Sequence, residues 1–205
     1  MPLIHHATRE ITAKIVYYGP ARGGKTTNLQ AIHLGIPETS RGPIVSLSTE
    51  GDRTLFFDFL PLELGTISGY TAKVQLYTVP GQVYYETTRR LVLQGADGVV
   101  FVADSAPAAQ TDNRTHFRGL QDNLLHQGVD PRSIPICLQY NKRDLSDAVP
   151  IAHLESALNF RRLPMRPATA LTGEGVFETL QTIVGAVFER LDHRYAVGRQ
   201  GAGRG

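Results

Sequence analysis

Short apolar runs alternate along the chain with longer segments that have a helical period. A strand that is covered on both faces of a sheet reads as a continuous apolar run, and GVVFVAD is such a run. The runs that predict parallel strands are Ile11–Tyr18, Ala72–Val79, Gly98–Asp104, Pro135–Tyr140 and Pro164–Ala168. The segments that predict helices lie near Lys25–Leu34, Tyr84–Gln94, Asp112–Gln127, Ile151–Leu158 and Val176–Tyr195. This alternation predicts an α/β fold of three layers, with helices on both faces of one sheet.

The stretch from Ile44 to Ala72 interrupts this alternation. It predicts two further strands, Ile44–Thr49 and Leu55–Leu60. Turn residues at 51–52 and 68–69 would join them to the strand that follows as antiparallel hairpins. The expected sheet is therefore mixed but mostly parallel.

The length of 205 residues fits one domain, which we expect to span 9–195. Residues 1–8 are expected to form a flexible N-terminus and 196–205 a disordered, glycine-rich tail that includes GRQGAGRG. The net charge of +2 and the scattered basic residues argue against nucleic acid as the main partner.

The lone Cys137, inside the apolar run IPICLQY, predicts a buried thiol in a reducing compartment. No apolar stretch near the N-terminus is long enough for a signal peptide or a membrane span. We therefore expect a cytoplasmic protein without direct membrane insertion. His5 and His6 are adjacent, but neighbouring histidines at a chain end do not by themselves indicate a metal site.

A glycine-rich motif, GPARGGKT at 19–26, follows the first predicted strand and precedes the first predicted helix. It fits the pattern GxxxxGK[ST], in which backbone N–H groups and the helix N-terminus surround phosphate oxygens. Lys25 would reach the β- and γ-phosphates, and the Thr26 hydroxyl would be a ligand of Mg²⁺. The phosphate-binding residues predicted here are Gly19, Arg22, Gly23, Gly24, Lys25, Thr26 and Thr27.

A second motif, Asn141-Lys142-Arg143-Asp144, stands at the end of the ICLQY strand. The Asp144 carboxylate can accept hydrogen bonds from N1–H and N2–H₂ of guanine, a pair of donors that adenine lacks. Lys142 would lay its aliphatic stem along the base, and Asn141 would tie this loop to the phosphate loop. A third base-side element is expected at Thr169-Ala170-Leu171, where the Ala170 N–H is our choice for the contact with guanine O6.

A phosphate loop combined with NKxD resembles the GTPase superfamily. Several segments, namely KIVYYGP, DRTLFFDFLPL, LYTVPGQVYYETTRRLVLQGADGVVFVADSAP, QYNKRDL and GVFETL, narrow the resemblance to the MglA family of bacterial Ras-like GTPases. The similarity runs from about Arg9 to about Leu191. The chain departs from that family's pattern in Gln110–Leu120, in Phe160–Arg166 and in the tail. In the third base-side element, Leu171 replaces the lysine that is usual in the GTPase superfamily.

The resemblance implies roles for the segments between the two motifs. Thr54 would bind Mg²⁺ and the γ-phosphate, Gly81 would approach the γ-phosphate through its N–H, and Gln82 would orient the attacking water. Thr78 stands where Ras-like proteins usually carry an aspartate on the magnesium side. Asp58 is the acid that the resemblance offers as compensation.

The resemblance also implies that Arg53 acts as an arginine finger within its own chain, an effect of about 10³–10⁵ in rate. A solvated loop charge is the alternative for Arg53, and Arg22 is a second candidate for the role. The expected catalytic set is Gln82, Arg53 and Lys25. By the same resemblance, a roadblock-fold partner like MglB would activate hydrolysis, polarity or motility effectors would bind the GTP form, and the isolated protein would be a monomer that partners can recruit to a cell pole.

The expected function is a small GTPase that binds GTP or GDP with Mg²⁺, hydrolyses GTP and switches its shape. Two alternatives stay open at this point. The first is a scaffold that holds nucleotide with negligible hydrolysis, which Thr78 and Arg22 would favour. The second is an ATP-using kinase or motor, which leaves Asn141-Lys142-Arg143-Asp144 without an explanation.

Overall fold

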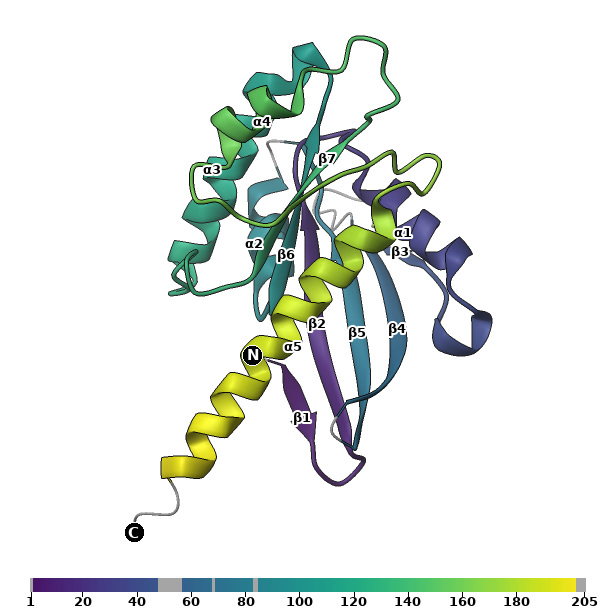
Figure 1. Cartoon of the computed structure of the whole chain (residues 1–205), viewed down its shortest axis with the longest axis vertical. Coiled ribbons are helices and arrows are strands. Elements are labelled where there is room, and N and C mark those ends of the chain that lie inside the picture. Colours follow the sequence, from purple (N-terminus) through teal and green to yellow (C-terminus); the bar gives the residue numbers. More distant parts are fainter. Residues whose placement is uncertain (1, 48–56, 68, 83–84, 202–205) are drawn as a thin grey trace.

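One mixed sheet runs through the centre of the molecule (Figure 1). The computed structural model describes residues 2–47, 57–67, 69–82 and 85–201. The strand order is β3-β4-β5-β2-β6-β7-β8, with β1 paired to β2. The strands are β1 (Leu3–His5), β2 (Glu10–Tyr18), β3 (Val45–Leu47), β4 (Phe57–Ile67), β5 (Tyr70–Thr78), β6 (Gly98–Asp104), β7 (Ile136–Asn141) and β8 (Met165–Pro167).

The pairing of the strands is the mixed, mostly parallel one that the sequence predicts. Strands β5, β2, β6, β7 and β8 are parallel, whereas β3, β4 and β5 form antiparallel pairs. Strand β2 is flanked by β5 on one side and by β6 on the other. The loop that follows β2 therefore lies where the order of the parallel strands reverses, which is where open α/β sheets bind ligands.

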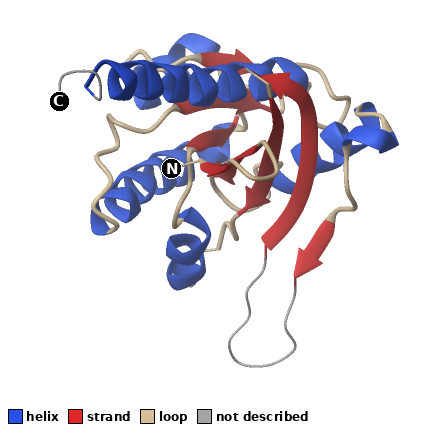
Figure 2. Ribbon diagram, turned by 90° about the horizontal axis from the view of Figure 1, so that it is seen from below, coloured by secondary structure: helices blue, strands red, loops and turns tan. Residues whose placement is uncertain are grey.

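Helices cover both faces of the sheet and make three layers (Figures 1 and 2). One core lies between the sheet and α1 and α5, and it includes Leu29, Ile183 and Val187. The other core lies between the sheet and α2, α3 and α4, and it includes Val92 and Leu120. The helices are α1 (Lys25–Gly35), α2 (Glu86–Leu93), α3 (Gln110–His126), α4 (Ile151–Leu158) and α5 (Val176–Gly201), and short 3₁₀ turns lie at Glu38–Ser40 and Pro107–Ala109.

Two chain ends differ from the sequence-based expectation. Leu3–His5 pairs antiparallel with the start of β2, and His6 Nδ1 lies 2.9 Å from the hydroxyl of Tyr70, so this part of 1–8 has regular structure. At the other end, α5 extends to Gly201, beyond the expected end at Tyr195. Once a helix is nucleated, each further residue adds a hydrogen bond, which allows the last turns to continue past the apolar pattern.

Cys137 is buried in strand β7, as its apolar surroundings predict. Burial raises the pKa of its thiol to about 12. This thiol is therefore a packing group of the core. Within the described part of the chain, none of the helices is both long enough and apolar enough to cross a bilayer.

Candidate functional site

The phosphate loop connects β2 to α1 and turns on glycines that have no room for a side chain. Gly19 has φ +147°, and a Cβ atom there would stand 2.2 Å from the carbonyl oxygen of Val102. Gly24 precedes the helix at φ +99°, and a Cβ atom there would stand 2.1 Å from Nδ2 of Asn141. The loop thus packs closely against β6 and against the loop after β7, with its N–H groups at the N-terminus of α1.

Lys25, the motif lysine, is buried at 7% exposure. Its ammonium donates to the carbonyl oxygens of Pro20 at 2.6 Å and Gly19 at 3.0 Å. Burial, together with the nearby Arg89 charge, lowers the pKa of Lys25 to about 8, and Asp58 opposes this shift. Both of these acceptors are neutral carbonyls, and a phosphate group at the loop would give the ammonium a negatively charged partner.

Asp58, from β4, gathers three hydroxyl groups beside the phosphate loop. Its Oδ2 accepts from Thr26 Oγ1 at 2.6 Å and from Thr78 Oγ1 at 2.9 Å, and its Oδ1 accepts from Ser46 Oγ at 2.7 Å. The Thr78 hydroxyl also accepts from the backbone N–H of Asp58 at 2.8 Å. Threonine at position 78 therefore places the carboxylate of Asp58 next to Thr26.

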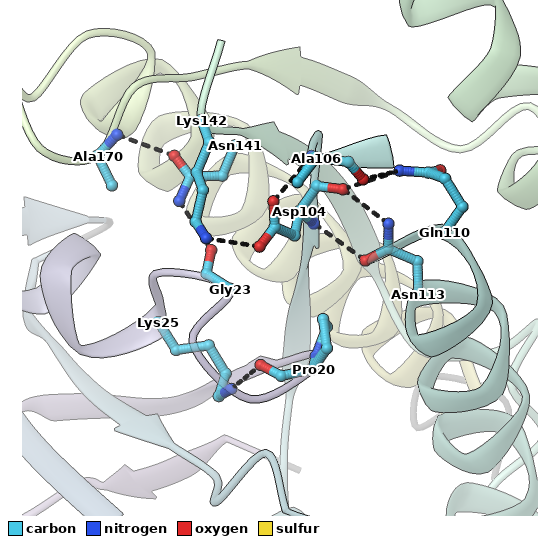
Figure 3. Close-up of polar contacts among 10 residues, drawn as sticks. All are labelled: Pro20, Gly23, Lys25, Asp104, Ala106, Gln110, Asn113, Asn141, Lys142 and Ala170. Atoms are coloured by element: carbon cyan, nitrogen blue, oxygen red, sulfur yellow. Dashed lines mark hydrogen bonds and ion pairs between the residues drawn. The ribbon is translucent and has the colours of Figure 1, made fainter. Parts of the chain in front are cut away.

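The base-side motif is joined to the phosphate loop by Asn141, as the sequence predicts (Figure 3). Its Nδ2 donates to the carbonyl oxygen of Gly23 at 2.8 Å, and its Oδ1 accepts from the N–H of Ala170 at 2.9 Å. One buried side chain thus connects three loops. Thr169 is buried, its N–H donates to the carbonyl oxygen of Glu174 at 2.9 Å, and this bond closes the third loop.

The bond to Asn141 changes the expectation for Ala170. Its N–H, our choice for guanine O6, is already engaged by Asn141 Oδ1. Leu171 follows it, with 82% of its surface exposed. Among the described residues, no acceptor is bonded to the Leu171 N–H, so that donor is available to a ligand.

Lys142 and Asp144 differ in how they are held. Lys142 has φ +65°, and its ammonium donates to Asp104 Oδ2 at 2.6 Å (Figure 3). The other oxygen of Asp104 accepts from the N–H of Ala106 at 2.9 Å. Asp144 is exposed, and none of the described residues donates to its carboxylate. Asp104 was missed by the sequence analysis, although an acid at the end of a buried strand was a usable signal.

A cavity of about 630 Å³ lies beside the phosphate loop, between α1, β4 and the segment after β5. Exposed Arg22, with φ +59°, and the two threonines of the loop line one side, and Gly81 and Gln82 line the other. A Cβ atom on Gly81 would stand 2.2 Å from the backbone nitrogen of Ala21, so this glycine lies directly against the phosphate loop. Arg53 and Thr54 lie outside the described residues.

The predicted site residues that are described therefore gather along one edge of the sheet. The phosphate loop, Asp58 and Gly81 form one end, and the loops of Asp144 and Leu171 form the other, with Asn141 between them. The buried lysine at one end of this edge suits an anionic group, and the exposed carboxylate at the other end suits a group with hydrogen-bond donors.

Comparison with known proteins gives independent information on this arrangement. No protein-family model matches the chain. Over 191 residues, the chain is 51% identical to the mutual gliding-motility protein MglA of Myxococcus xanthus (strain DK1622), covering 93% of this chain and 98% of that protein. It is 29% identical over 189 residues to ADP-ribosylation factor-like protein 6 of Caenorhabditis briggsae, covering 88% of this chain and 89% of that one. It is 24% identical over 183 residues to ADP-ribosylation factor-like protein 4C of Homo sapiens, covering 86% and 87%.

Proposed function

The chain belongs to the MglA family of small GTPases, and we propose that it is a switch that binds GTP or GDP with Mg²⁺, hydrolyses GTP and serves bacterial motility or cell polarity. The proposed process rests on its similarity to the gliding-motility protein. The proposed chemistry rests on the residues of the site, as follows.

The observation that carries the proposal is the pair of hydrogen bonds made by the Asn141 side chain, which donates to the carbonyl of Gly23 and accepts from the N–H of Ala170. It holds the phosphate end and the base end of the site in one fixed relation. A ligand that fits both ends must carry phosphates and a base at a set spacing, as a nucleotide does. We assign phosphate contacts to the backbone of Gly23 and Gly24, to Lys25, and to the first turn of α1 with Thr26 and Thr27.

Guanine specificity is assigned to the other end of the site. The exposed Asp144 carboxylate would accept from N1–H and N2–H₂ of the base. The Leu171 N–H would donate to O6, because the Ala170 N–H is engaged by Asn141. Lys142, fixed by Asp104, would support the base with its stem. Adenine would leave the Asp144 carboxylate without a donor, which is the physical basis for rejecting it.

The residues next to the phosphate loop fit Mg²⁺. This ion is usually bound through one or two carboxylates together with substrate phosphates and water, not by a cage of protein ligands. Thr26 supplies a hydroxyl oxygen, and Asp58 supplies a carboxylate at hydrogen-bond distance from it. Among the described residues, no group of three or more acids, histidines or cysteines competes as a metal site. Thr54 is assigned to the ion by family membership alone. The ion would neutralise charge on the β- and γ-phosphates.

An Asp58→Asn variant tests the magnesium assignment. It removes the charge while keeping the side chain's size. GDP should therefore dissociate about tenfold faster, and its dissociation rate should respond less to chelation of Mg²⁺. GDP release is measured by stopped-flow fluorescence with and without chelator. Glu63→Gln, an exposed acid on the same strand, is the matched control. Equal chelator sensitivity in Asp58→Asn and the wild-type protein would contradict the assignment.

Hydrolysis is assigned to the segment after β5 and to residues supplied by the same chain. Gly81 lies against the phosphate loop, and Gln82 follows it at the rim of the cavity. Gln82 would orient water, Lys25 would offset charge on the phosphates, and Arg53 would act on the γ-phosphate as a finger in cis. The proposed activator is a roadblock-fold protein like MglB, and polarity or motility effectors would recognise the GTP form.

Single-turnover hydrolysis of radiolabelled GTP tests the function. A rate on the order of 10⁻⁴ s⁻¹ would mean that Arg53 and Gln82 rest away from the phosphate, and a rate near 10⁻² s⁻¹ that they are already in place. Gln82→Ala should slow the reaction, whereas Gln30→Ala, an exposed glutamine on α1, should not. GTP that stays intact under every condition, including a roadblock-type partner, would instead support a nucleotide-holding scaffold.

A further inference from the structure

The side chain of His116 links helix α3 to the segment after β5. Its Nε2 lies 2.9 Å from the carbonyl oxygen of Gly81, and its Nδ1 lies 2.8 Å from the carbonyl oxygen of Asp112, one turn earlier in the helix. The residue is 8% exposed, so water does not replace these contacts easily.

Both partners of the His116 ring are carbonyl oxygens, which only accept hydrogen bonds. A neutral imidazole carries one N–H and one lone pair, so one ring nitrogen would face an oxygen lone pair. The imidazolium carries two N–H groups and satisfies both contacts. The geometry therefore fits the charged form of His116.

Charged groups around His116 act in both directions. The cavity that His116 borders, between α2 and α3, has a volume of about 510 Å³. Arg89 is buried there and opposes a second positive charge, and the exposed Arg114 and Arg118 add to this opposition. The carboxylates of Glu86 and Asp122, and the carbonyls already named, favour the charge. Among the described residues that line this cavity, Tyr18, from β2, is the other titratable group.

The contact at Gly81 has a counterpart at the next residue. The carbonyl oxygen of Gln82 accepts from Arg89 Nη1 at 2.6 Å. Two consecutive carbonyls are thus held by two helices, by α3 through His116 and by α2 through Arg89. Gly81 itself lies against the backbone of Ala21 in the phosphate loop.

We propose that His116 is a positioning residue that, in its imidazolium form, holds the Gly81–Gln82 backbone against the phosphate loop, so that its protonation controls GTP hydrolysis. This inference rests on the proposed function, because it assigns a cause to the position of Gly81 and Gln82. Loss of the proton removes one of two hydrogen bonds and leaves a nitrogen lone pair facing a carbonyl oxygen. The proposed contacts to guanine and to the α- and β-phosphates lie on other loops, so GDP affinity stays unchanged.

The protonation state of His116 is measured first, without any turnover. Long-range ¹H–¹⁵N correlation spectra of the GDP-bound wild-type protein should show both ring nitrogens of His116 as protonated under the conditions of the hydrolysis assay. The signal is assigned by its absence in His116→Gln. His126, exposed at the end of the same helix, is the reference residue. A His116 ring with one unprotonated nitrogen down to about pH 5.5 would overturn the proposal.

The effect on hydrolysis is then followed by single-turnover assays between about pH 5.5 and 7.5. The wild-type rate should fall by about tenfold as His116 loses its proton, and His116→Gln should be slow and nearly independent of pH over this range. His126→Gln should follow the wild-type profile. A His116→Gln profile identical to that of the wild type would overturn this inference and leave the proposed function standing. A wild-type protein that fails to hydrolyse GTP at every pH would contradict the proposed function, and the spectra would still decide the state of His116.

Discussion

At the base end of the site, three neighbouring residues have different tasks because their surroundings differ. Asn141 is buried, and both the nitrogen and the oxygen of its amide form hydrogen bonds with other loops. The Lys142 ammonium donates to Asp104. Asp144 projects into solvent without a donor among the described residues. In the proposed function, selectivity for the base therefore depends on one carboxylate, that of Asp144, and the other two residues fix the loop that carries it.

Asp144→Asn exchanges one acceptor oxygen for a donor while the loop keeps its anchors. Guanine nucleotides should bind more weakly by on the order of 10²-fold, because the amide N–H₂ faces the N–H groups of the base. Xanthine nucleotides, which carry an acceptor at that position, should gain in relative affinity. Binding of GDP and XDP is measured by fluorescence competition. Asp147→Asn, an exposed aspartate in the same loop, is the control, and an unchanged guanine preference in Asp144→Asn would contradict the assignment.

Lys25 links nucleotide affinity to pH. In the free protein, burial lowers the pKa of the Lys25 ammonium to about 8, and bound phosphates would raise this pKa. Below that pH the ammonium is already charged, so affinity should be flat. Above it, binding must take up a proton, and affinity should fall by up to about tenfold per pH unit. Calorimetry of GDP binding in buffers of different ionisation enthalpy measures the uptake; no uptake above this pKa would contradict the shift.

The sequence could predict which residues lie together at the site where a motif has several residue types at a fixed spacing, as in 19–26 and 141–144. Asp104 and His116 belong to no such motif. Their positions depend on which strand and which helix pack beside the loops, and the spacing of residues along the chain does not predict this packing. A lone histidine on a helix next to Phe117 and Leu120 reads as part of the core, and only the facing carbonyl of Gly81 shows its second contact.

At the scale of elements, the buried strands lie where the apolar runs predict them. The bounds of strand β6, Gly98–Asp104, and of helix α4, Ile151–Leu158, match the predicted ranges. Strand β4 continues past the predicted end at Leu60, through Pro61 and Gly65, to Ile67. Beyond Phe59 it pairs with β5, with a register shift between Glu63 and Thr66. The carbonyl oxygen of Pro61 accepts from the N–H of Gly42, so Pro61 turns this backbone edge, including its nitrogen, away from the β5 ladder.

Gly81→Ala tests how the segment after β5 sits on the phosphate loop. The added Cβ atom would meet Ala21 backbone atoms at 2.2 and 2.3 Å, so the whole segment must move. Single-turnover GTP hydrolysis should slow by on the order of 10²-fold, whereas GDP binding should persist. Gly185→Ala is the matched control in α5, where a Cβ atom meets nothing within 4 Å. That variant should hydrolyse normally and gain about 0.5–1 kcal/mol in stability. Normal hydrolysis by Gly81→Ala would contradict the packing argument.

For the molecule as a whole, the proposed nucleotide would bridge the loops that follow β2, β7 and β8 and should therefore stabilise the entire sheet. GDP with Mg²⁺ at about 1,000 times its Kd should add about 4 kcal/mol to the free energy of unfolding, and ADP at the same concentration should add none. Thermal unfolding followed by circular dichroism measures both. An equal shift of Tm with ADP would favour the ATP-using alternative and contradict guanine recognition.

The overall architecture was predictable because strand–helix alternation and right-handed crossovers leave few ways to arrange such a chain. The chain ends were less predictable. The short β1 forms by pairing with the start of β2, and the local sequence does not indicate that this edge of β2 is open for pairing.

The burial of Cys137 has a practical consequence for spectroscopy. The chain holds one cysteine, and that thiol is buried with its pKa raised to about 12, so thiol-reactive dyes should leave the native protein unlabelled. A cysteine introduced at an exposed position would then carry the whole label without any prior removal of native thiols. The molecule is in this respect ready for single-molecule fluorescence, in which the two nucleotide states could be watched interconverting in real time.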